Sequence, residues 1–312
     1  MTKIAFVFPG QGSQKVGMGV ELANHAEESK RFFDKADETV GFALSELIEN
    51  GPQEELTLTY HAQPALLTVG AMIADRLMNA GITPAFTAGH SLGEYTALVA
   101  SDVLSFEEGV ESVYKRGLYM NEAVPAGVGG MAAILGLDVA EITRITDSIT
   151  AEGFSVQPAN LNCPGQVVIS GTKEGVDRAC VALKEAGARR ALPLDVSGPF
   201  HSTLMQPAAE QLQATLQGMS MQDATIPVIA NVNAKVVVKH EDLQQLLVEQ
   251  LYSPVRWEES VRTMLDEGVT HFVECGPGKV LSGLIKKIDR QATVLSAYDE
   301  ATMQEVIDQL KG

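Results

Sequence analysis

The sequence predicts an α/β fold with a mostly parallel sheet, into which a small ferredoxin-like (βαββαβ) subdomain is inserted. Short apolar runs alternate with helix-like stretches at both ends of the chain, which is typical of strands joined by helices. The middle of the chain changes to the order strand, helix, strand, strand, helix, strand. No low-complexity segment, charge block or repeat interrupts the 312 residues, so we expect no flexible linker between the parts.

The first part of the chain supplies the start of the parallel sheet. Residues 4–8 are a short apolar run that predicts a buried strand, and residues 85–89 predict a second one. Helical texture covers residues 16–33 and 62–79, and another helix is expected from about Ser91. Strands that alternate with helices in this way predict parallel pairing.

The middle part predicts the inserted subdomain at about residues 126–197. The turn signal Asn162-Cys163-Pro164-Gly165 separates two of its strands. The expected elements are strands 130–135, 156–160, 166–170 and 190–194 and helices 139–150 and 173–186. The large subdomain is then formed by residues 1–125 and 198–312, whose later part contains strands 226–230, 271–274 and 293–296 and a helix over 280–288.

The composition excludes several classes of function. A formal net charge of −17 is opposite to the basic field that nucleic-acid binding requires, so we expect no nucleic acid as a partner. No apolar run of about eighteen residues and no signal-peptide pattern appears, which predicts a cytoplasmic protein without a membrane partner. The three cysteines are widely spaced and form no C-x-x-C pair, so we expect free thiols and no metal site.

The run Gly89-His90-Ser91-Leu92-Gly93 fits the pattern G-x-S-x-G, in which a serine lies on a tight strand-to-helix turn. Glycines allow neighbouring backbone to approach such a turn, and the start of the following helix supplies backbone N–H groups. Ser91 is therefore a candidate nucleophile. The pattern alone fits an ordinary glycine turn with a capping serine equally well.

A serine nucleophile needs a base, and His201 is the best placed of six histidines. It ends a glycine- and proline-containing run where the inserted subdomain rejoins the large one, and a cleft is expected there. On the residues alone, a structural loop histidine is an equally good interpretation. The glycine-rich run 8–14 lacks the Walker and dinucleotide patterns. It is then either a simple turn or a cradle for an oxyanion at Gln11.

Several motifs, in order along essentially the whole chain, point to one family. They are Gly10-Gln11-Gly12-Ser13-Gln14, residues 89–95 (GHSLGEY), Lys115-Arg116-Gly117, Pro125-Ala126-Gly127, Asn160-x-Asn162-x-Pro164-Gly165-Gln166, Gly198-Pro199-Phe200-His201-Ser202, Asn231-Val232-Asn233, residues 250–257 and Glu274-Cys275-Gly276-Pro277-Gly278. The chain resembles the malonyl-CoA:acyl carrier protein transacylases of type II fatty acid synthesis and, more broadly, the acyltransferase domains of polyketide and fatty acid synthases. This resemblance implies a hydrolase-like α/β core.

The resemblance also implies a serine–histidine dyad. Ser91 matches the serine that is acylated, and His201 matches the general base that later acts as general acid. In the family a backbone carbonyl rather than a carboxylate orients the histidine, and Gln250 matches that position. Asp195 lies close to His201 in the sequence, but it is not expected to complete a triad.

Three further site residues follow from the resemblance. The backbone N–H groups of Gln11 and Leu92 match an oxyanion hole. Arg116 matches the arginine that grips the free carboxylate of a malonyl group, which a planar guanidinium can bind through two hydrogen bonds. Without the motif match, Arg116 would be interpreted as one half of a surface salt bridge.

The implied activity is ping-pong transfer of a malonyl group from malonyl-CoA to the phosphopantetheine thiol of acyl carrier protein, through a malonyl-serine ester and without a cofactor. Two basic pairs are candidates for docking the acidic carrier, Lys286 with Lys287 and Arg189 with Arg190, and each also fits a solvated face. We expect a monomer. The competing hypotheses are a serine esterase or thioesterase, which has little use for an arginine in the acyl pocket, and a non-catalytic module that binds the carrier.

Overall fold

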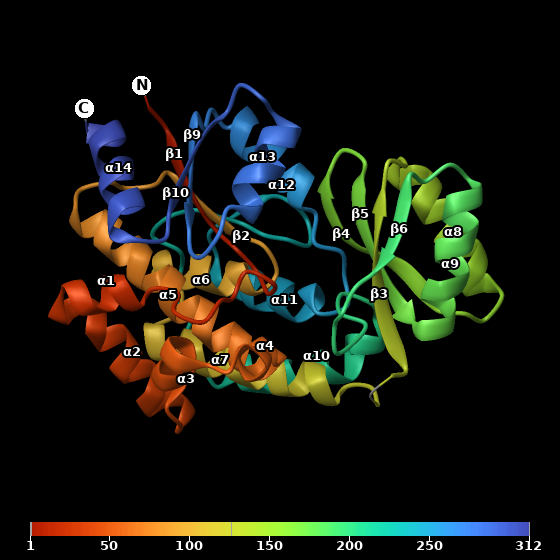
Figure 1. Cartoon of the computed structure of the whole chain (residues 1–312), viewed down its shortest axis with the longest axis horizontal. Coiled ribbons are helices and arrows are strands. Elements are labelled where there is room, and N and C mark those ends of the chain that lie inside the picture. The colour runs from red at the N-terminus through yellow and green to blue at the C-terminus, as the bar shows by residue number, and fades with distance from the viewer. Residues whose placement is uncertain (1, 126, 312) are drawn as a thin grey trace.

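The computed structural model describes residues 2–125 and 127–311. It contains two separate sheets, one of six strands and one of four. Figure 1 shows the six-stranded sheet and most of the helices in one large part, with the four-stranded sheet and its two helices set at one end of the molecule.

The large sheet is mostly parallel, as the sequence predicts. Its strands are β1 (Ile4–Phe8), β2 (Phe86–Gly89), β7 (Val228–Ile229), β8 (Val236–Val237), β9 (His271–Cys275) and β10 (Thr293–Ala297). Their order across the sheet is β10-β9-β1-β2-β7-β8. All neighbours pair in parallel except β7 and β8, which pair antiparallel at one edge.

Helices cover both faces of this sheet, because successive side chains of a strand point to opposite faces. In β1, Phe6 and Phe8 belong to the apolar core on one face, while Ala5 and Val7 belong to the core on the other. The helices of the large part are α1 (Val20–His25), α2 (Glu27–Val40), α3 (Leu44–Asn50), α4 (Gln53–Thr57), α5 (Thr59–Asn79), α6 (Leu92–Ala100), α7 (Phe106–Glu122), the 3₁₀ turn η1 (Thr203–Met205), α10 (Gln206–Gln217), α11 (His240–Gln250), α12 (Trp257–Asp266), α13 (Val280–Ile288) and α14 (Glu300–Lys311).

One predicted helix is wrong. Residues 16–33 do not form a single helix, since α1 begins only at Val20 and α2 follows after a break at Ala26, whose φ of −145° and ψ of 140° are extended. Gly17 and Gly19, with φ of 88° and 72°, delay the start of α1. Such positive φ values suit glycine and do not occur in a right-handed helix.

The small sheet is antiparallel throughout. It consists of β3 (Gly129–Leu135), β4 (Val156–Cys163), β5 (Gln166–Thr172) and β6 (Arg190–Pro193), in the order β4-β5-β3-β6. Two helices, α8 (Val139–Ala151) and α9 (Lys173–Glu185), share an apolar core with it that includes Ile134, Ile142 and Leu183. Each of these six elements lies where the sequence predicts it, with small differences at its ends.

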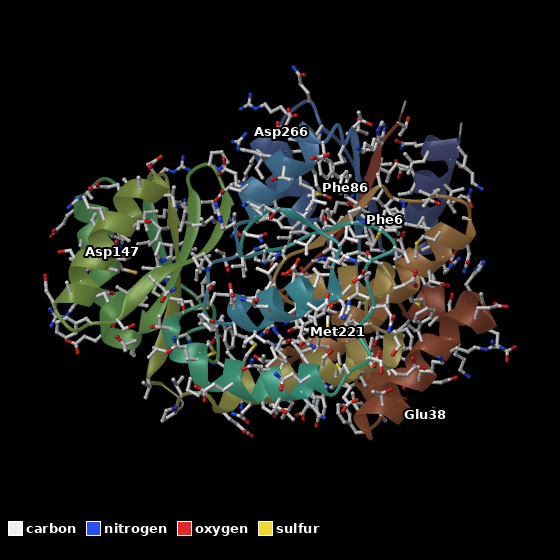
Figure 2. All side chains as sticks on the ribbon, turned by 180° about the vertical axis from the view of Figure 1, so that it is seen from behind. Phe6, Glu38, Phe86, Asp147, Met221 and Asp266 are labelled. Carbon is white, nitrogen blue, oxygen red and sulfur yellow. The ribbon has the colours of Figure 1, made fainter. Side chains whose placement is uncertain are left out.

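The interior and the surface separate as the residue types suggest. Figure 2 shows Phe6 and Phe86 inside the large part, where both are buried, while Glu38, Asp147 and Asp266 are exposed on outer helices. Within residues 2–125 and 127–311, none of the helices combines the length and the apolar character that crossing a membrane requires.

Candidate active site

The candidate active site lies where three adjacent strands of the large sheet end. Gln11 follows β1, Ser91 follows β2 and Asn231 follows β7, and these strands are neighbours in the sheet. Because parallel strands end at the same edge, the loops that follow them converge there. His201 reaches this place from the segment between β6 and η1.

The serine turn has the tight geometry that its two glycines predict. Ser91 lies between β2 and α6 with a φ of 51° and a ψ of −107°, a strained conformation for a residue with a side chain. A Cβ on Gly89 would lie 1.9 Å from the backbone of Gly93, and a Cβ on Gly93 would lie 2.1 Å from the carbonyl oxygen of Phe8. The pattern G-x-S-x-G is therefore a steric requirement of this turn.

Ser91 and His201 are in direct contact. The Ser91 Oγ lies 2.7 Å from His201 Nε2, and the other ring nitrogen, Nδ1, lies 2.7 Å from the carbonyl oxygen of Gln250. A carbonyl only accepts, so Nδ1 carries the proton and Nε2 is left to accept the hydroxyl proton of Ser91. Asp195 is one of the residues that line the cavity beside Ser91, and it is not the partner of Nδ1.

His201 is neutral over the physiological pH range. Its side chain is buried, and burial together with the nearby positive charge of Arg116 lowers its pKa to about 3, against the hydrogen bond to the Gln250 carbonyl, which raises it. A neutral imidazole is the form that can take a proton from a serine hydroxyl.

Arg116 is in the site and not on the surface, so its interpretation as half of a surface salt bridge is wrong. Its side chain is 1% exposed, on α7. Nη1 donates to Gln63 Oε1 at 2.7 Å, and Nη2 donates to Gln250 Oε1 at 2.9 Å and to Ser91 Oγ at 3.1 Å. All three acceptors are uncharged. A buried guanidinium without a carboxylate partner is rare, and it is suited to binding one.

The side chains of Gln250 and Asn231 hold the backbone of the site in place, a role that the sequence did not predict for either side chain. Gln250 Nε2 donates to the carbonyl oxygen of Ser91 at 3.0 Å and lies 3.1 Å from Asn231 Oδ1. Asn231 in turn accepts from the Ser91 backbone N–H at 2.8 Å and donates to the Gly89 carbonyl oxygen at 2.7 Å. Two buried amides therefore fix the backbone on both sides of the strained serine.

Gln11 and Leu92 line the cavity beside Ser91. This cavity has a volume of about 200 Å³, and its walls are Gln11, Gly12, Gln14, Thr57, His90, Ser91, Leu92, Arg116, Met120, Met131, Asn160, Leu194, Asp195, Val196, Phe200 and His201. Within the described ranges, no protein group accepts a hydrogen bond from the backbone N–H of Gln11 or of Leu92. The Gln11 side chain is fixed by a bond of 3.1 Å to Thr59 Oγ1.

The small sheet supplies one wall of the cavity and a tie to the serine turn. Met131 on β3 and Asn160 on β4 line the cavity. His90, next to Ser91, places Nε2 2.8 Å from Asn162 Oδ1 on β4. Burial lowers the pKa of His90, so its ring is also neutral. The contact therefore joins the small sheet to the turn without an added charge.

The two basic pairs predicted for docking, one on α13 and one at β6, lie near the same end of the small sheet. Gln166 and Arg190 both pair with Leu135 of β3, from opposite sides. Lys287 donates to Gln166 Oε1 at 3.2 Å, so the end of α13 meets the same end of the sheet. Lys286, Lys287, Arg189 and Arg190 are all exposed.

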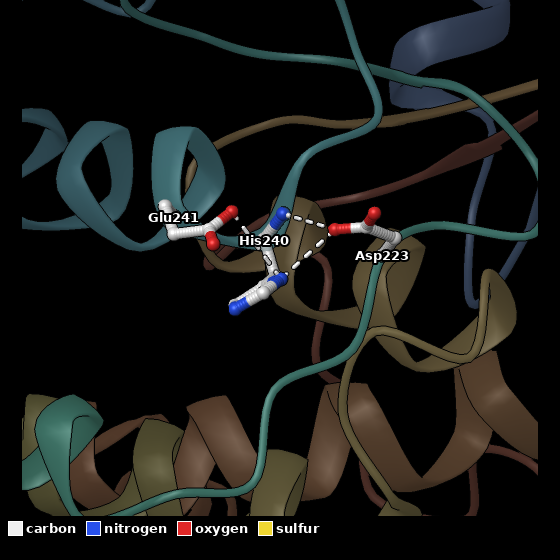
Figure 3. Close-up of side chains that lie close together, drawn as sticks. All are labelled: Asp223, His240 and Glu241. Atoms are coloured by element: carbon white, nitrogen blue, oxygen red, sulfur yellow. Dashed lines mark hydrogen bonds and ion pairs between the residues drawn. The ribbon is translucent and has the colours of Figure 1, made fainter.

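A second cluster has ligand types that a metal ion could use. Asp223, His240 and Glu241 lie together at the start of α11 (Figure 3), with one possible ligand atom from each within 4.8 Å of the others. Their hydrogen bonds explain the arrangement without an ion.

Asp223 is the centre of these bonds. Its Oδ1 accepts from the His240 backbone N–H at 3.1 Å and lies 2.8 Å from His240 Nδ1, and its Oδ2 pairs with Lys239 Nζ at 2.6 Å. Hydrogen bonds from Lys239 and His240 hold the pKa of Asp223 well below its usual range. We assign the cluster to the capping of α11.

The chain matches the family model described as the acyl transferase domain over residues 5–309. It is 57% identical over 311 residues to the malonyl CoA-acyl carrier protein transacylase of Bacillus subtilis, covering 100% of this chain and 98% of the relative. It is 46% identical over 296 residues to the protein of the same name from Staphylococcus aureus, covering 95% of this chain and 96% of the relative.

Solved structures agree in fold. The malonyl CoA-acyl carrier protein transacylase of Coxiella burnetii superposes with a TM-score of 0.97 at 44% identity, covering 100% of this chain and 98% of that one. A malonyl-transacylase solved in complex with its type II PKS acyl-carrier protein superposes with a TM-score of 0.96 at 43% identity, covering 99% and 100%. By its sequence and by its fold, the chain belongs to the acyl transferase family, among the malonyl-CoA:acyl carrier protein transacylases.

Proposed function

We propose that the protein transfers a malonyl group from malonyl-CoA to the phosphopantetheine thiol of acyl carrier protein, with Ser91 as the residue that carries the group. The single observation that supports this most is the placement of Arg116. Its guanidinium is buried, reaches the nucleophile itself at 3.1 Å, and has only neutral acceptors around it. An acyl group that ends in a carboxylate fits this surrounding, whereas an uncharged acyl group leaves the guanidinium without a carboxylate in direct contact.

The first half of the reaction acylates Ser91. His201 Nε2 takes the hydroxyl proton as the Ser91 oxygen attacks the thioester carbonyl of malonyl-CoA. The carbonyl of Gln250 keeps the proton on Nδ1 and stabilises the imidazolium that forms, the part that a carboxylate plays in a triad. When the tetrahedral intermediate collapses, the proton passes from Nε2 to the sulfur of coenzyme A, and a malonyl-serine ester remains.

The negative charge on the tetrahedral oxygen is met by the backbone N–H groups of Gln11 and Leu92. Both border the cavity beside Ser91, and neither donates to another protein group in the described part of the chain. Leu92 is also the first residue of α6, where the helix dipole favours negative charge. Donors of this kind contribute about 2.7–4 kcal/mol to the transition state.

The second half of the reaction reverses the first with another thiol. His201 takes the proton of the carrier's pantetheine thiol, the sulfur attacks the malonyl-serine ester, and the proton returns to Ser91 Oγ as the carrier thioester leaves. No step needs a redox change, a metal ion or a bound cofactor. The ester must survive until the carrier arrives, which requires that water is poorly placed to attack it.

The experiment that tests this function is an intact-mass measurement after incubation with malonyl-CoA. We expect a malonyl adduct on the wild-type protein that disappears when holo acyl carrier protein is added, as the carrier gains the same mass. Ser91→Ala should give no adduct, and Ser220→Ala, at an exposed serine that does not line the cavity, should behave as the wild type. Release of free malonate without transfer to the carrier would instead make the protein a thioesterase.

The carrier protein is proposed to dock on the basic surface formed by Lys286, Lys287, Arg189 and Arg190. The hydrogen bond between Lys287 and Gln166 and the pairing of Leu135 with both Gln166 and Arg190 support one continuous surface in place of two alternatives. Leu135 lies four residues along β3 from Met131, which borders the cavity, a separation of about 13 Å. Against a net charge of −17, such a local patch is what an acidic carrier would need.

The finer architecture is also proposed. The antiparallel order β4-β5-β3-β6 and the two helices on one face support a ferredoxin-like subdomain at residues 126–197, with 1–125 and 198–312 as a hydrolase-like large subdomain. We also propose that the whole protein is a cytoplasmic monomer. Cys163, Cys180 and Cys275 are free thiols in the structure, which is compatible with a reducing compartment.

A further inference from the structure

One buried carboxylate beside the site has no part in the mechanism above. Glu94 on α6 is 1% exposed. Its Oε2 accepts from Gln250 Nε2 at 2.7 Å and from the Asn231 backbone N–H at 3.2 Å. Its Oε1 is buried and has no hydrogen-bond partner among the described residues. A half-satisfied buried carboxylate destabilises a fold, so its presence here needs a reason.

Arg116 lies on the other side of the Gln250 side-chain amide, and it too has no charged group in direct contact. It is a buried cation whose three hydrogen-bond acceptors are neutral, and its Nε has no partner in the described ranges. The Gln250 side chain connects the two charges, since Oε1 accepts from Arg116 while Nε2 donates to Glu94. The cation and the carboxylate thus fix which way the amide points, and through it where the guanidinium lies.

We propose that Glu94 is a positioning residue: through the Gln250 side chain it is the counter-charge of Arg116 before substrate binds, and the malonyl carboxylate then brings a second negative charge to the same cation. This rests on the proposed malonyl transfer. It has a direct consequence for selectivity. The malonyl group must bind against the repulsion of Glu94 when Glu94 is ionised, and it is free of that repulsion when Glu94 is neutral. An acetyl group carries no charge, so its binding does not depend on whether Glu94 is ionised.

The surroundings leave Glu94 and Arg116 as the charges that matter. Of the elements packed against α6, β1 and β2 carry no titratable side chain, and the ionisable side chains of α5 lie outside its buried stretch 62–74. On α7, Arg116 is the buried charge, while Glu107, Glu108, Glu111, Lys115 and Glu122 are partly or fully exposed. Tyr95 and His201 are neutral near pH 7, because burial raises the pKa of Tyr95 and lowers that of His201. Burial also raises the pKa of Glu94 to about 7, against the hydrogen bonds from Gln250 and Asn231 and the charge of Arg116, which lower it.

The sign of the pH effect follows. Below about pH 7 Glu94 is mostly protonated and malonyl binds without repulsion, whereas above this pH Glu94 is ionised and opposes the malonyl carboxylate. The quantity to measure on the wild-type protein is the ratio of kcat/KM for malonyl-CoA to kcat/KM for acetyl-CoA, because effects on Ser91 and His201 cancel in it. We expect this ratio to fall roughly three- to tenfold from pH 6 to pH 8, as two like charges several ångström apart require. A ratio that is constant over this range overturns the proposal.

Glu94→Gln removes the charge and keeps an oxygen acceptor for Gln250. We expect its malonyl-to-acetyl ratio to be independent of pH and, at pH 8, higher than that of the wild type by the same factor. Glu274→Gln is the matched control, since Glu274 is also a buried glutamate with a raised pKa but caps α13 through Leu281 and Ser282. It should keep the wild-type dependence on pH.

Two results for Glu94→Gln would overturn the proposal. One is a dependence on pH like that of the wild type, and the other is an equal loss of malonyl and acetyl transfer, which is the behaviour of a purely structural residue. If the variant does not fold, the wild-type ratio alone decides. Absence of any malonyl-Ser91 ester at every pH would be a failure of the proposed function, which this design separates from a failure of the Glu94 role.

Discussion

The two sheets of this molecule are built differently and contribute differently to the site. The parallel sheet is buried on both faces, and its strand ends carry Gln11, Ser91 and Asn231 into one place. The antiparallel sheet packs its helices on one face, and it contributes a cavity wall and the tie from Asn162 to His90. The side chains that we propose to react or to bind charge come from the large part, and the small part supplies one wall of the cavity.

This division suggests how the molecule separates two tasks. Reacting groups need positions fixed within a fraction of an ångström, and a doubly covered parallel sheet supplies rigid strand ends for them. The cavity wall along which a phosphopantetheine thiol would enter does not need such exact positions. It can therefore belong to the smaller, antiparallel part. Changes in the large part should therefore abolish chemistry, and changes in the small part should alter it modestly.

The strongest test of this division is His201→Ala. Loss of the base should lower the rate of malonyl-serine formation by about 10²–10⁴-fold, because water must then accept the Ser91 proton in the transition state. Single-turnover measurement of the adduct by mass spectrometry gives the rate. His25→Ala, at an exposed histidine on α1, is the control and should be indistinguishable from the wild type. A loss of less than tenfold would remove His201 from the role of base.

Arg116→Ala should come next in size and sharpen the comparison by acting on one substrate only. It removes the charge that a malonyl carboxylate would bind, so kcat/KM for malonyl-CoA should fall about a hundredfold or more. The kcat/KM for acetyl-CoA should fall much less, so the preference for malonyl-CoA over acetyl-CoA becomes smaller. Steady-state kinetics with both thioesters measures this. Equal losses for both would mean that Arg116 acts only by supporting Gln63 and Gln250.

Asn162→Ala, on the small sheet, should have the smallest effect on turnover. It leaves the part-buried Nε2 of His90 without its partner, which costs about 1 kcal/mol of folding free energy. Thermal unfolding should therefore show a melting temperature lower by a few degrees, while kcat changes by no more than a few fold. If turnover fell as far as in His201→Ala, the small sheet would belong to the catalytic apparatus and the division above would be wrong.

Much of this arrangement could be predicted from the sequence, because some signals are local. The strand at residues 4–8 has the predicted bounds, because an apolar run of this length is typical of a buried strand and too short for most helices. The serine turn was recognisable because each of its glycines meets backbone directly. The helix expected over 16–33 failed because two glycines with positive φ and an extended alanine override a helical pattern.

The support beneath the site was harder to predict, because it depends on contacts between distant residues. Gln250, Asn231 and Glu94 meet only after α11, β7 and α6 are packed together. One signal was nevertheless present. Gln63 is a polar residue in the long apolar stretch of α5, and such a residue needs a buried partner, which is Arg116.

Ser91 and His201, the two residues in contact at 2.7 Å, both have positive φ values, 51° and 56°. Each such conformation costs about 1–3 kcal/mol for a residue that is not glycine. The native state therefore gives up part of its stability to keep the two side chains facing each other. A chain released from selection for activity could regain that stability by drifting toward glycine at both positions. Persistence of serine and histidine at these positions in a lineage would thus be a record of continued use of the site.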